Sequence, residues 1–415
     1  MTCIVIIGAG PAGIMLAMAL ASTLTPKDNI EVVVLEKSAY FYHTDGTPRA
    51  FTDESYVQKL FIPLDNVIPK AASSFTMIVR AVAIKISAEP RGEVTYRTIG
   101  EDDQEVLGQD VTLAFDYLVV ATGSSYSTPI KPAENSYSRS ATEAQLEEVR
   151  EQIEKAQSIL VVGGGSVGCE VAGDIAAKFP HKSVAILSAS STLLAHDNVT
   201  TKFRERLRDG LANKLKVKLI LGERLVPQQR LVGNIFVKQT LVTDKGTKIE
   251  SDVQLLCGGF HPVTTLIQDM DASLVDARGF VKVNPQLQLT GDSGECYHNI
   301  FVLGDASNNP SPKQGYVAAH QGRFLAGELV AVIRKKQPAF TKPYPKIETE
   351  MMSIPLGPDG GVTQLPFFGG IVVGDFLTWL FKSRDYFAGR YWQVLGAGKP
   401  PSTAPPPKGC VESAP

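Results

Sequence analysis

A chain of 415 residues exceeds the size at which one hydrophobic core keeps growing, so we expect two or three domains. Its 41 basic and 43 acidic residues give a formal net charge of −2, and no Lys/Arg run follows a nucleic-acid groove, which argues against a nucleic-acid partner. The five cysteines are odd in number and lack C-x-x-C or metal-type spacing, so neither a structural metal nor the redox-active cysteine pair of a disulfide reductase is expected.

Residues 3 to 36 predict a βαβ unit, with an apolar strand, a glycine turn, a helix and a second strand. Gly8, Gly10 and Gly13 form a G-x-G-x-x-G pattern, which allows a tight turn and lets backbone N–H groups approach a pyrophosphate. Glu36 ends the second strand, where a carboxylate can bind ribose hydroxyls. Together these features predict a nucleotide site; the alternative is a glycine turn that only joins packed elements.

Short alternating runs between residues 76 and 115 predict a small antiparallel element. It leads into an apolar strand at 117 to 123 that closes on Ala121, Thr122 and Gly123. A following helix, from about 142 to 155, is rich in Glu and is predicted to be a solvated connector.

A second βαβ pattern begins at Ser158 and contains a second glycine turn, formed by Gly163, Gly165 and Gly168. The strand after it ends in Ser188, at the place where an acid would repel the 2′-phosphate of NADPH. The pattern therefore predicts a nicotinamide nucleotide site with little choice between NADH and NADPH. The alternative is a βαβ unit without a ligand.

The chain then reaches an apolar strand that ends in Gly304-Asp305 and a helix from about 313 to 335. In this order, the two glycine turns, Ala121-Thr122-Gly123 and Gly304-Asp305 resemble the two-dinucleotide-domain flavoproteins. In those proteins the Gly-Asp carboxylate holds the ribityl chain of FAD, so the resemblance implies this role for Asp305.

Within that superfamily the chain more closely resembles the apoptosis-inducing-factor-like ferroptosis suppressor proteins, which are themselves similar to type II NADH dehydrogenases. The motifs that carry the resemblance include GGGSVGCEVAGDI, FVLGDASNNPSPKQGY, LGPDGGVTQ and FKSRDYF. The resemblance implies non-covalent FAD, NADH or NADPH as the electron donor, and a quinone such as ubiquinone as the acceptor.

The same resemblance assigns residues to the cofactors. It implies that Arg49 contacts the phosphate side of FAD and that the Val82 backbone contacts adenine, although Arg49 could form a surface ion pair and Val82 could belong to the core. The residues that would wrap the FAD pyrophosphate are Gly8, Ala9, Gly10, Pro11 and Ala12.

Three residues are expected at the reaction site by resemblance. Glu170 would lie where nicotinamide meets flavin, whereas a structural role would be that of an acid near a helix start. Lys382 and Phe387, with Trp392, would surround the flavin and the acceptor, because a cation near a flavin can stabilise negative charge on it. The alternative for Lys382 is a solvated helix surface.

The expected fold class is α/β, with two Rossmann-like dinucleotide-binding domains of the pyridine nucleotide-disulfide reductase type and a small C-terminal segment. The expected divisions are 1–138 and 258–338 for FAD, 139–257 for NAD(P)H, 339–398 for the C-terminal domain, and 399–415 for a disordered Pro-rich tail.

The resemblance implies an NAD(P)H:quinone oxidoreductase that protects lipids from oxidation. Two alternatives remain open: a reductase of a small electron-transfer protein and a redox-sensing NAD(P)H-binding signalling flavoprotein. The residues set neither the oligomeric state nor the physiological acceptor.

The first strand and an apolar segment near the C-terminus lead to an expected cellular location. A first strand at about Cys3 leaves no room for a signal peptide, so we expect a cytoplasmic protein. Residues 365 to 381 form an apolar segment too short to span a bilayer. From Asp375 onward the spacing predicts a helix that places Phe376, Leu380 and Phe387 near one stripe. Such a helix could touch a membrane or lipid-droplet surface, or only complete the core.

Overall fold

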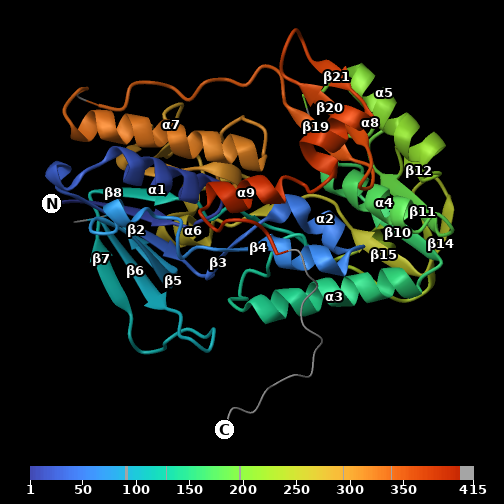
Figure 1. Cartoon of the computed structure of the whole chain (residues 1–415), viewed down its shortest axis with the longest axis horizontal. Coiled ribbons are helices and arrows are strands. Elements are labelled where there is room, and N and C mark those ends of the chain that lie inside the picture. The colour runs from blue at the N-terminus through green and yellow to red at the C-terminus, as the bar shows by residue number, and fades with distance from the viewer. Residues whose placement is uncertain (89–91, 128, 196–197, 293, 338, 402–415) are drawn as a thin grey trace.

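The computed structural model describes residues 1–88, 92–127, 129–195, 198–292, 294–337 and 339–401. Figure 1 shows two groups of strands at opposite ends of the molecule's long axis, each accompanied by helices. The expected α/β class is confirmed by these two sheets. The predicted disorder of residues 399–415 falls almost wholly outside the described residues.

The larger sheet has eight strands in the order β17-β18-β8-β1-β2-β5-β6-β7. Its central pairs β18·β8, β8·β1, β1·β2 and β2·β5 are all parallel, although β18 lies almost 300 residues after β1 in the sequence. Parallel strands align their carboxyl ends, so the loops that follow these strands meet at one edge of the sheet. The strands are β1 (Thr2–Ile7), β2 (Ile30–Glu36), β5 (Thr76–Ser87), β6 (Glu93–Thr98), β7 (Val111–Ala114), β8 (Tyr117–Val120), β17 (Gln288–Thr290) and β18 (Cys296–Val302).

Two helices cover one face of this sheet, α1 (Pro11–Thr23) and α7 (Gly315–Ile333), which lie side by side in Figure 1. Their close approach depends on Gly322, because a Cβ atom there would stand 2.2 Å from the carbonyl oxygen of Ala12. The predicted antiparallel element is also present, since β5, β6 and β7 pair in antiparallel fashion.

The smaller sheet has four parallel strands in the order β12-β11-β10-β15. Its helix α4 (Ser166–Lys178) begins in the second glycine turn. The expected solvated helix is α3 (Arg139–Lys155), and its Leu146, Val149 and Ile153 are buried, so the expectation of a solvated connector was wrong for this face. The remaining elements of this region are β10 (Ser158–Val162), β11 (Ser183–Ser188), β12 (Lys218–Leu221), β13 (Gln239–Val242), β14 (Lys248–Ser251), β15 (Val253–Leu256) and α5 (Thr201–Asp209).

The C-terminal segment forms a three-stranded antiparallel sheet followed by short helices. The continuous helical stripe expected from Asp375 to Phe387 was wrong, because α8 passes into a π-helix that ends at Ser383. Tyr386 and Phe387 then have positive φ values of 50° and 65°. These left-handed conformations interrupt the helix before α9 begins. The elements are β19 (Met352–Pro355), β20 (Gly361–Leu365), β21 (Ile371–Val373), α8 (Asp375–Thr378), the π-helix Trp379–Ser383 and α9 (Ala388–Val394).

Four short strands and two short α-helices of the described part of the chain remain. They are β3 (Tyr40–Tyr42) paired with β4 (Phe61–Pro63), β9 (Ser124–Ser125) paired with β16 (His261–Pro262), α2 (Thr47–Ala50) and α6 (Thr265–Met270). Among all these helices, none combines the length and the apolar character needed to span a bilayer.

Candidate active site

The first glycine turn is packed against protein on one side and open on the other. Gly8 has φ 96°, and a Cβ there would lie 2.6 Å from the carbonyl oxygen of Ala121. A Cβ on Gly13 would lie 1.9 Å from the carbonyl oxygen of Gly8, whereas a Cβ on Gly10 would meet no heavy atom within 4 Å. The open side adjoins the N-terminus of α1, which starts with Pro11 and Ala12, so the turn fits a pyrophosphate.

Glu36 lies beside this turn, as its proposed role requires. Its carboxylate accepts hydrogen bonds from the backbone N–H groups of Ala9 at 2.6 Å and Ser38 at 2.9 Å. Burial raises the pKa of Glu36, and these hydrogen bonds act in the opposite direction. A carboxylate held at the end of β2 in this way fits a ribose ligand.

Asp305, which is expected to bind the ribityl chain of FAD, lies at the same edge of the sheet, after β18. Ser124 donates a hydrogen bond to its carboxylate at 2.7 Å, and the Lys131 ammonium lies 3.2 Å away. The Ala121-Thr122-Gly123 turn leads directly into Ser124, and the Thr122 hydroxyl donates to the carbonyl of Val263 at 2.6 Å. The sequence reasoning missed Ser124 and Lys131.

The second glycine turn repeats the geometry of the first. Gly163 has φ 134°, and a Cβ on Gly168 would lie 2.0 Å from the carbonyl oxygen of Gly163. A Cβ on Gly165 would meet no heavy atom within 4 Å, so this turn also has an open side. Ser188 is buried at the end of β11, where a Cβ on Gly164 would stand 2.7 Å from its hydroxyl oxygen.

Glu170 and Lys382, both expected at the reaction site, form a buried ion pair. The Nζ atom of Lys382 lies 2.7 Å from Oε1 of Glu170 and also donates to the carbonyl of Ser353 at 3.0 Å. Burial raises the pKa of Glu170 to about 7, although the ammonium opposes that shift. Burial alone would lower the pKa of Lys382, but the Glu170 carboxylate holds it above its usual value. The solvated surface considered for Lys382 was therefore wrong.

Arg49 is buried, which excludes one of the two alternatives drawn from the sequence. Its guanidinium forms a buried ion pair with Asp174 at 3.0 Å and donates to the carbonyl of Ser383 at 3.1 Å, so the surface ion pair was wrong. Val82 lies on β5 opposite Arg97 and is partly exposed. No contact in the protein tests the cofactor role expected for either residue.

Phe387 and Trp392, the two aromatic residues expected near the flavin, differ in burial. Phe387 is partly buried and its N–H donates to the carboxylate of Asp385 at 3.1 Å. Trp392 is buried and its indole N–H donates to the carbonyl of Lys59 at 3.0 Å. Trp392 thus belongs to the hydrophobic core that contains α1 and α7.

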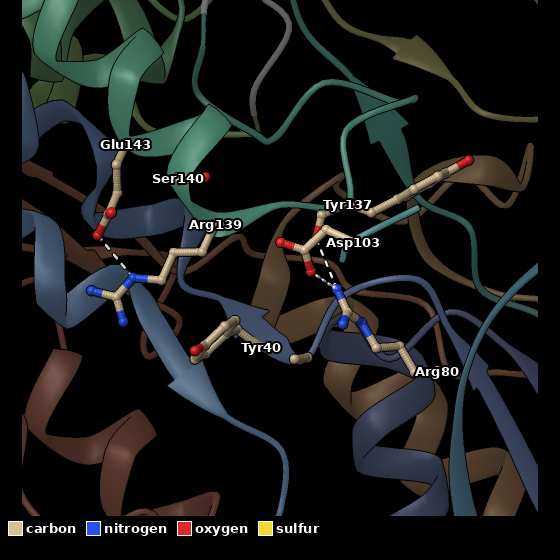
Figure 2. A pocket seen from close by; sticks show the side chains of 8 residues that line it. Tyr40, Arg80, Asp103, Tyr137, Arg139, Ser140 and Glu143 are labelled. Atoms are coloured by element: carbon tan, nitrogen blue, oxygen red, sulfur yellow. Dashed lines mark hydrogen bonds and ion pairs between the residues drawn. The ribbon is translucent and has the colours of Figure 1, made fainter. Parts of the chain in front are cut away.

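A cavity of about 360 Å³ lies near the first glycine turn's partner strand β2. Figure 2 shows the side chains that line it. Arg80 lines this cavity and lies opposite Glu36 in the pairing of β5 with β2. The cavity therefore adjoins the end of β2, where Glu36 is expected to bind ribose. Its two arginines already have carboxylate partners: Arg80 pairs with Asp103 and Arg139 with Glu143. The lining residues are Ala39, Tyr40, Arg80, Asp103, Tyr137, Arg139, Ser140 and Glu143.

A family model described as pyridine nucleotide-disulphide oxidoreductase matches residues 2–322. The chain is 30% identical to ferroptosis suppressor protein 1 of Taeniopygia guttata, with 96% of each chain covered. It is 28% identical to apoptosis-inducing factor homolog B of Dictyostelium discoideum, with 96% of this chain and 97% of the relative covered.

Solved structures share the fold at lower identity. A sulfide:quinone oxidoreductase from Aquifex aeolicus matches with a TM-score of 0.73 and 16% identity over 97% of this chain and 93% of that one. A water-forming NADH oxidase from Lactobacillus brevis, bound to NADH, matches with a TM-score of 0.60 and 18% identity, covering 88% of this chain and 75% of that one.

Proposed function

The chain belongs to the pyridine nucleotide-disulphide oxidoreductase family, as an FAD-dependent NAD(P)H oxidoreductase of the ferroptosis suppressor type, and we propose that its electron acceptor is a quinone. We further propose that residues 1–138 and 258–338 bind FAD, residues 139–257 bind NAD(P)H and residues 339–398 form the acceptor side. When bound, FAD supplies the redox chemistry, because it accepts a hydride from NAD(P)H and passes electrons on.

The buried pair of Lys382 and Glu170 is the observation that carries the acceptor proposal. Glu170 comes from the helix that begins in the second glycine turn, and Lys382 comes from the C-terminal segment. A fixed ammonium can stabilise negative charge that develops during electron transfer. A carboxyl group with a pKa of about 7 can hold or release a proton near neutral pH, and quinone reduction consumes protons.

An exposed apolar surface on the C-terminal segment supports a lipid-soluble acceptor. Phe368 is 97% exposed and Phe376 is 71% exposed, and the exposed Arg384 lies on the same segment. Exposed apolar side chains with a basic side chain on the same segment suit contact with a phospholipid membrane surface, from which a quinone could enter. The other large apolar side chains exposed on this segment are Phe367, Ile371, Leu377, Leu380, Phe381 and Val394.

We propose lipid protection as the consequence of this activity. A reduced quinone in a membrane can donate hydrogen to lipid radicals, and the printed name of the relative, ferroptosis suppressor protein, is consistent with such a role. The measurement is the oxidation rate of polyunsaturated phospholipid vesicles that contain ubiquinone and NADH. We expect the protein to slow oxidation only when both compounds are present.

Stopped-flow reoxidation of the NADH-reduced flavin by a short-chain quinone tests the acceptor. We expect rapid reoxidation in wild type and slower reoxidation in Lys382→Met, with flavin reduction by NADH much less affected. Rapid reoxidation by a ferredoxin but not by quinone would indicate a reductase of an electron-transfer protein. A long-lived charge-transfer complex with no turnover would indicate a sensor, and either result overturns the proposal.

A further inference from the structure

The C-terminal residues next to Lys382 are held by a second buried ion pair, one helical turn from Glu170. Asp174 follows Glu170 on α4, and its Oδ1 atom lies 3.0 Å from the Arg49 guanidinium. Its Oδ2 atom accepts a hydrogen bond from the Tyr386 hydroxyl at 2.8 Å. Arg49, Asp174 and Tyr386 are 6%, 1% and 0% exposed. One carboxylate therefore joins α2, α4 and the C-terminal segment.

The backbone around Lys382 is bound from several directions. Arg49 donates to the carbonyl of Ser383 at 3.1 Å, and Tyr56 donates to the carbonyl of Asp385 at 2.7 Å. The Nε2 atom of His43 donates to the carbonyl of Tyr386 at 2.8 Å. All of these donors come from residues 43 to 56. This stretch follows Glu36 closely in the sequence and contributes no strand to the larger or the smaller sheet.

Residues 382 to 386 have little regular secondary structure to fix their conformation. Lys382 and Ser383 end a five-residue π-helix, and Tyr386 has a positive φ of 50°. A non-glycine residue in this conformation persists only where surrounding contacts determine it. The contacts made by Arg49, Asp174 and Tyr386 are among the buried polar contacts that do so.

We propose that Asp174, Arg49 and Tyr386 form a positioning unit that holds the Lys382 ammonium against Glu170 at the acceptor site. This inference rests on the proposed role of Lys382 in quinone reduction and extends it to residues that act through the backbone around Lys382. It assigns Arg49 a positioning role through Asp174. The unit acts through geometry, since it fixes the backbone from which Lys382 extends.

Lysine labelling tests the geometry independently of quinone turnover. The FAD-loaded protein is treated with acetic anhydride, and mass spectrometry compares the acetylation of Lys382 with that of the exposed Lys27. Tyr386→Phe and Asp174→Asn should raise the relative labelling of Lys382 by roughly fivefold or more, because local opening exposes the ammonium. Tyr386→Phe keeps the buried ring and guards against a folding defect in Asp174→Asn.

The matched control is Lys214→Met. Lys214 pairs with Asp375 at 2.8 Å and also ties the C-terminal segment to the smaller sheet region, but both side chains are more than half exposed. This variant should leave Lys382 labelling unchanged. Unchanged labelling in both Tyr386→Phe and Asp174→Asn, with FAD still bound, overturns the positioning unit.

A double-mutant cycle tests the functional consequence. Tyr386→Phe alone should slow flavin reoxidation by quinone roughly tenfold, because a small displacement of a reacting group has effects of this order. In a Lys382→Met background the same change should have no further effect, and flavin reduction should change little in either background. Additive effects on reoxidation would mean a general structural role and contradict the inference.

The two experiments separate this inference from the proposed function. If Lys382→Met reoxidises at the wild-type rate, the acceptor proposal fails, while the labelling result still decides whether the unit positions Lys382. If Lys382→Met is slow but Tyr386→Phe changes neither labelling nor reoxidation, the acceptor proposal stands and the positioning unit is wrong.

Discussion

The Nζ atom of Lys382 lies 2.7 Å from Oε1 of Glu170, although 212 residues separate the two in the sequence. The side chains are 13% and 6% exposed, so each charge depends on the other for compensation. The contact joins the helix of the second glycine turn to the C-terminal segment. It makes the ion pair both a structural element and the centre of the proposed chemistry.

Removing one member of this pair should destabilise the protein more than removing an exposed charge. At a pH above the Glu170 pKa of about 7, where this carboxylate is ionised, we expect Lys382→Met to lower the free energy of unfolding by about 3 kcal/mol, because it leaves Glu170 buried without its cation. Lys214→Met breaks an exposed pair and should cost less than about 1 kcal/mol. Urea unfolding of the two variants measures the difference, and equal losses would show that the buried pair is not needed for stability.

Quinone-dependent reoxidation should slow as the pH rises through the range in which Glu170 loses its proton. Burial raises the Glu170 pKa to about 7, so the carboxyl is largely protonated below that pH and ionised above it. Only the protonated form can donate a proton during quinone reduction. Single-turnover reoxidation from about pH 6 to about pH 8 should show this fall in wild type. Glu170→Gln should remove the transition; a transition that persists there belongs to another group.

Asp305→Ala should weaken FAD binding before it affects anything else. Loss of a charged hydrogen-bond acceptor at the expected ribityl site should raise the Kd for FAD by roughly tenfold or more. Fluorescence quenching of free FAD measures this in apoprotein. The control is Asp292→Ala, whose carboxylate is 80% exposed and pairs with Lys282. Equal FAD affinity in wild type and Asp305→Ala would remove Asp305 from the cofactor site.

Ser188→Asp should select against NADPH. The new carboxylate would stand at the end of β11 and repel a 2′-phosphate, while NADH could still bind through its ribose hydroxyls. We expect kcat/KM for NADPH to fall relative to NADH by roughly tenfold to a hundredfold. Ser183→Asp, at the exposed start of the same strand, is the control. If wild type already rejects one nucleotide, another residue sets the choice.

Substitution of Phe368 and Phe376 by serine should weaken binding to anionic phospholipid vesicles. Both side chains are mainly exposed, so the double variant should fold normally and reduce a short-chain quinone at the wild-type rate. Val232→Ser serves as the control, because Val232 is 95% exposed on another part of the molecule. Vesicle co-sedimentation measures the effect, and unchanged binding would mean that this surface does not contact lipid.

Local sequence was sufficient for the nucleotide turns. Gly8 and Gly163 have positive φ values, and Gly13 and Gly168 allow backbone approaches that any Cβ would block. Such requirements act within a few residues, so they leave a recognisable pattern. The inward face of α3 also left a signal, since Leu146, Val149 and Ile153 repeat at helical spacing. The abundance of Glu on the opposite face concealed it.

The sequence by itself therefore determined the two dinucleotide-binding units, their strand ends and the residue types available at the site. The tertiary structure alone decided that Lys382 meets Glu170, that Arg49 meets Asp174, and that Tyr386 turns inward. Arg49 and Asp174 are 125 residues apart, and their contact depends on the packing of α2, α4 and an irregular C-terminal segment. No local pattern encodes such a contact, because its geometry exists only once separate elements have packed together.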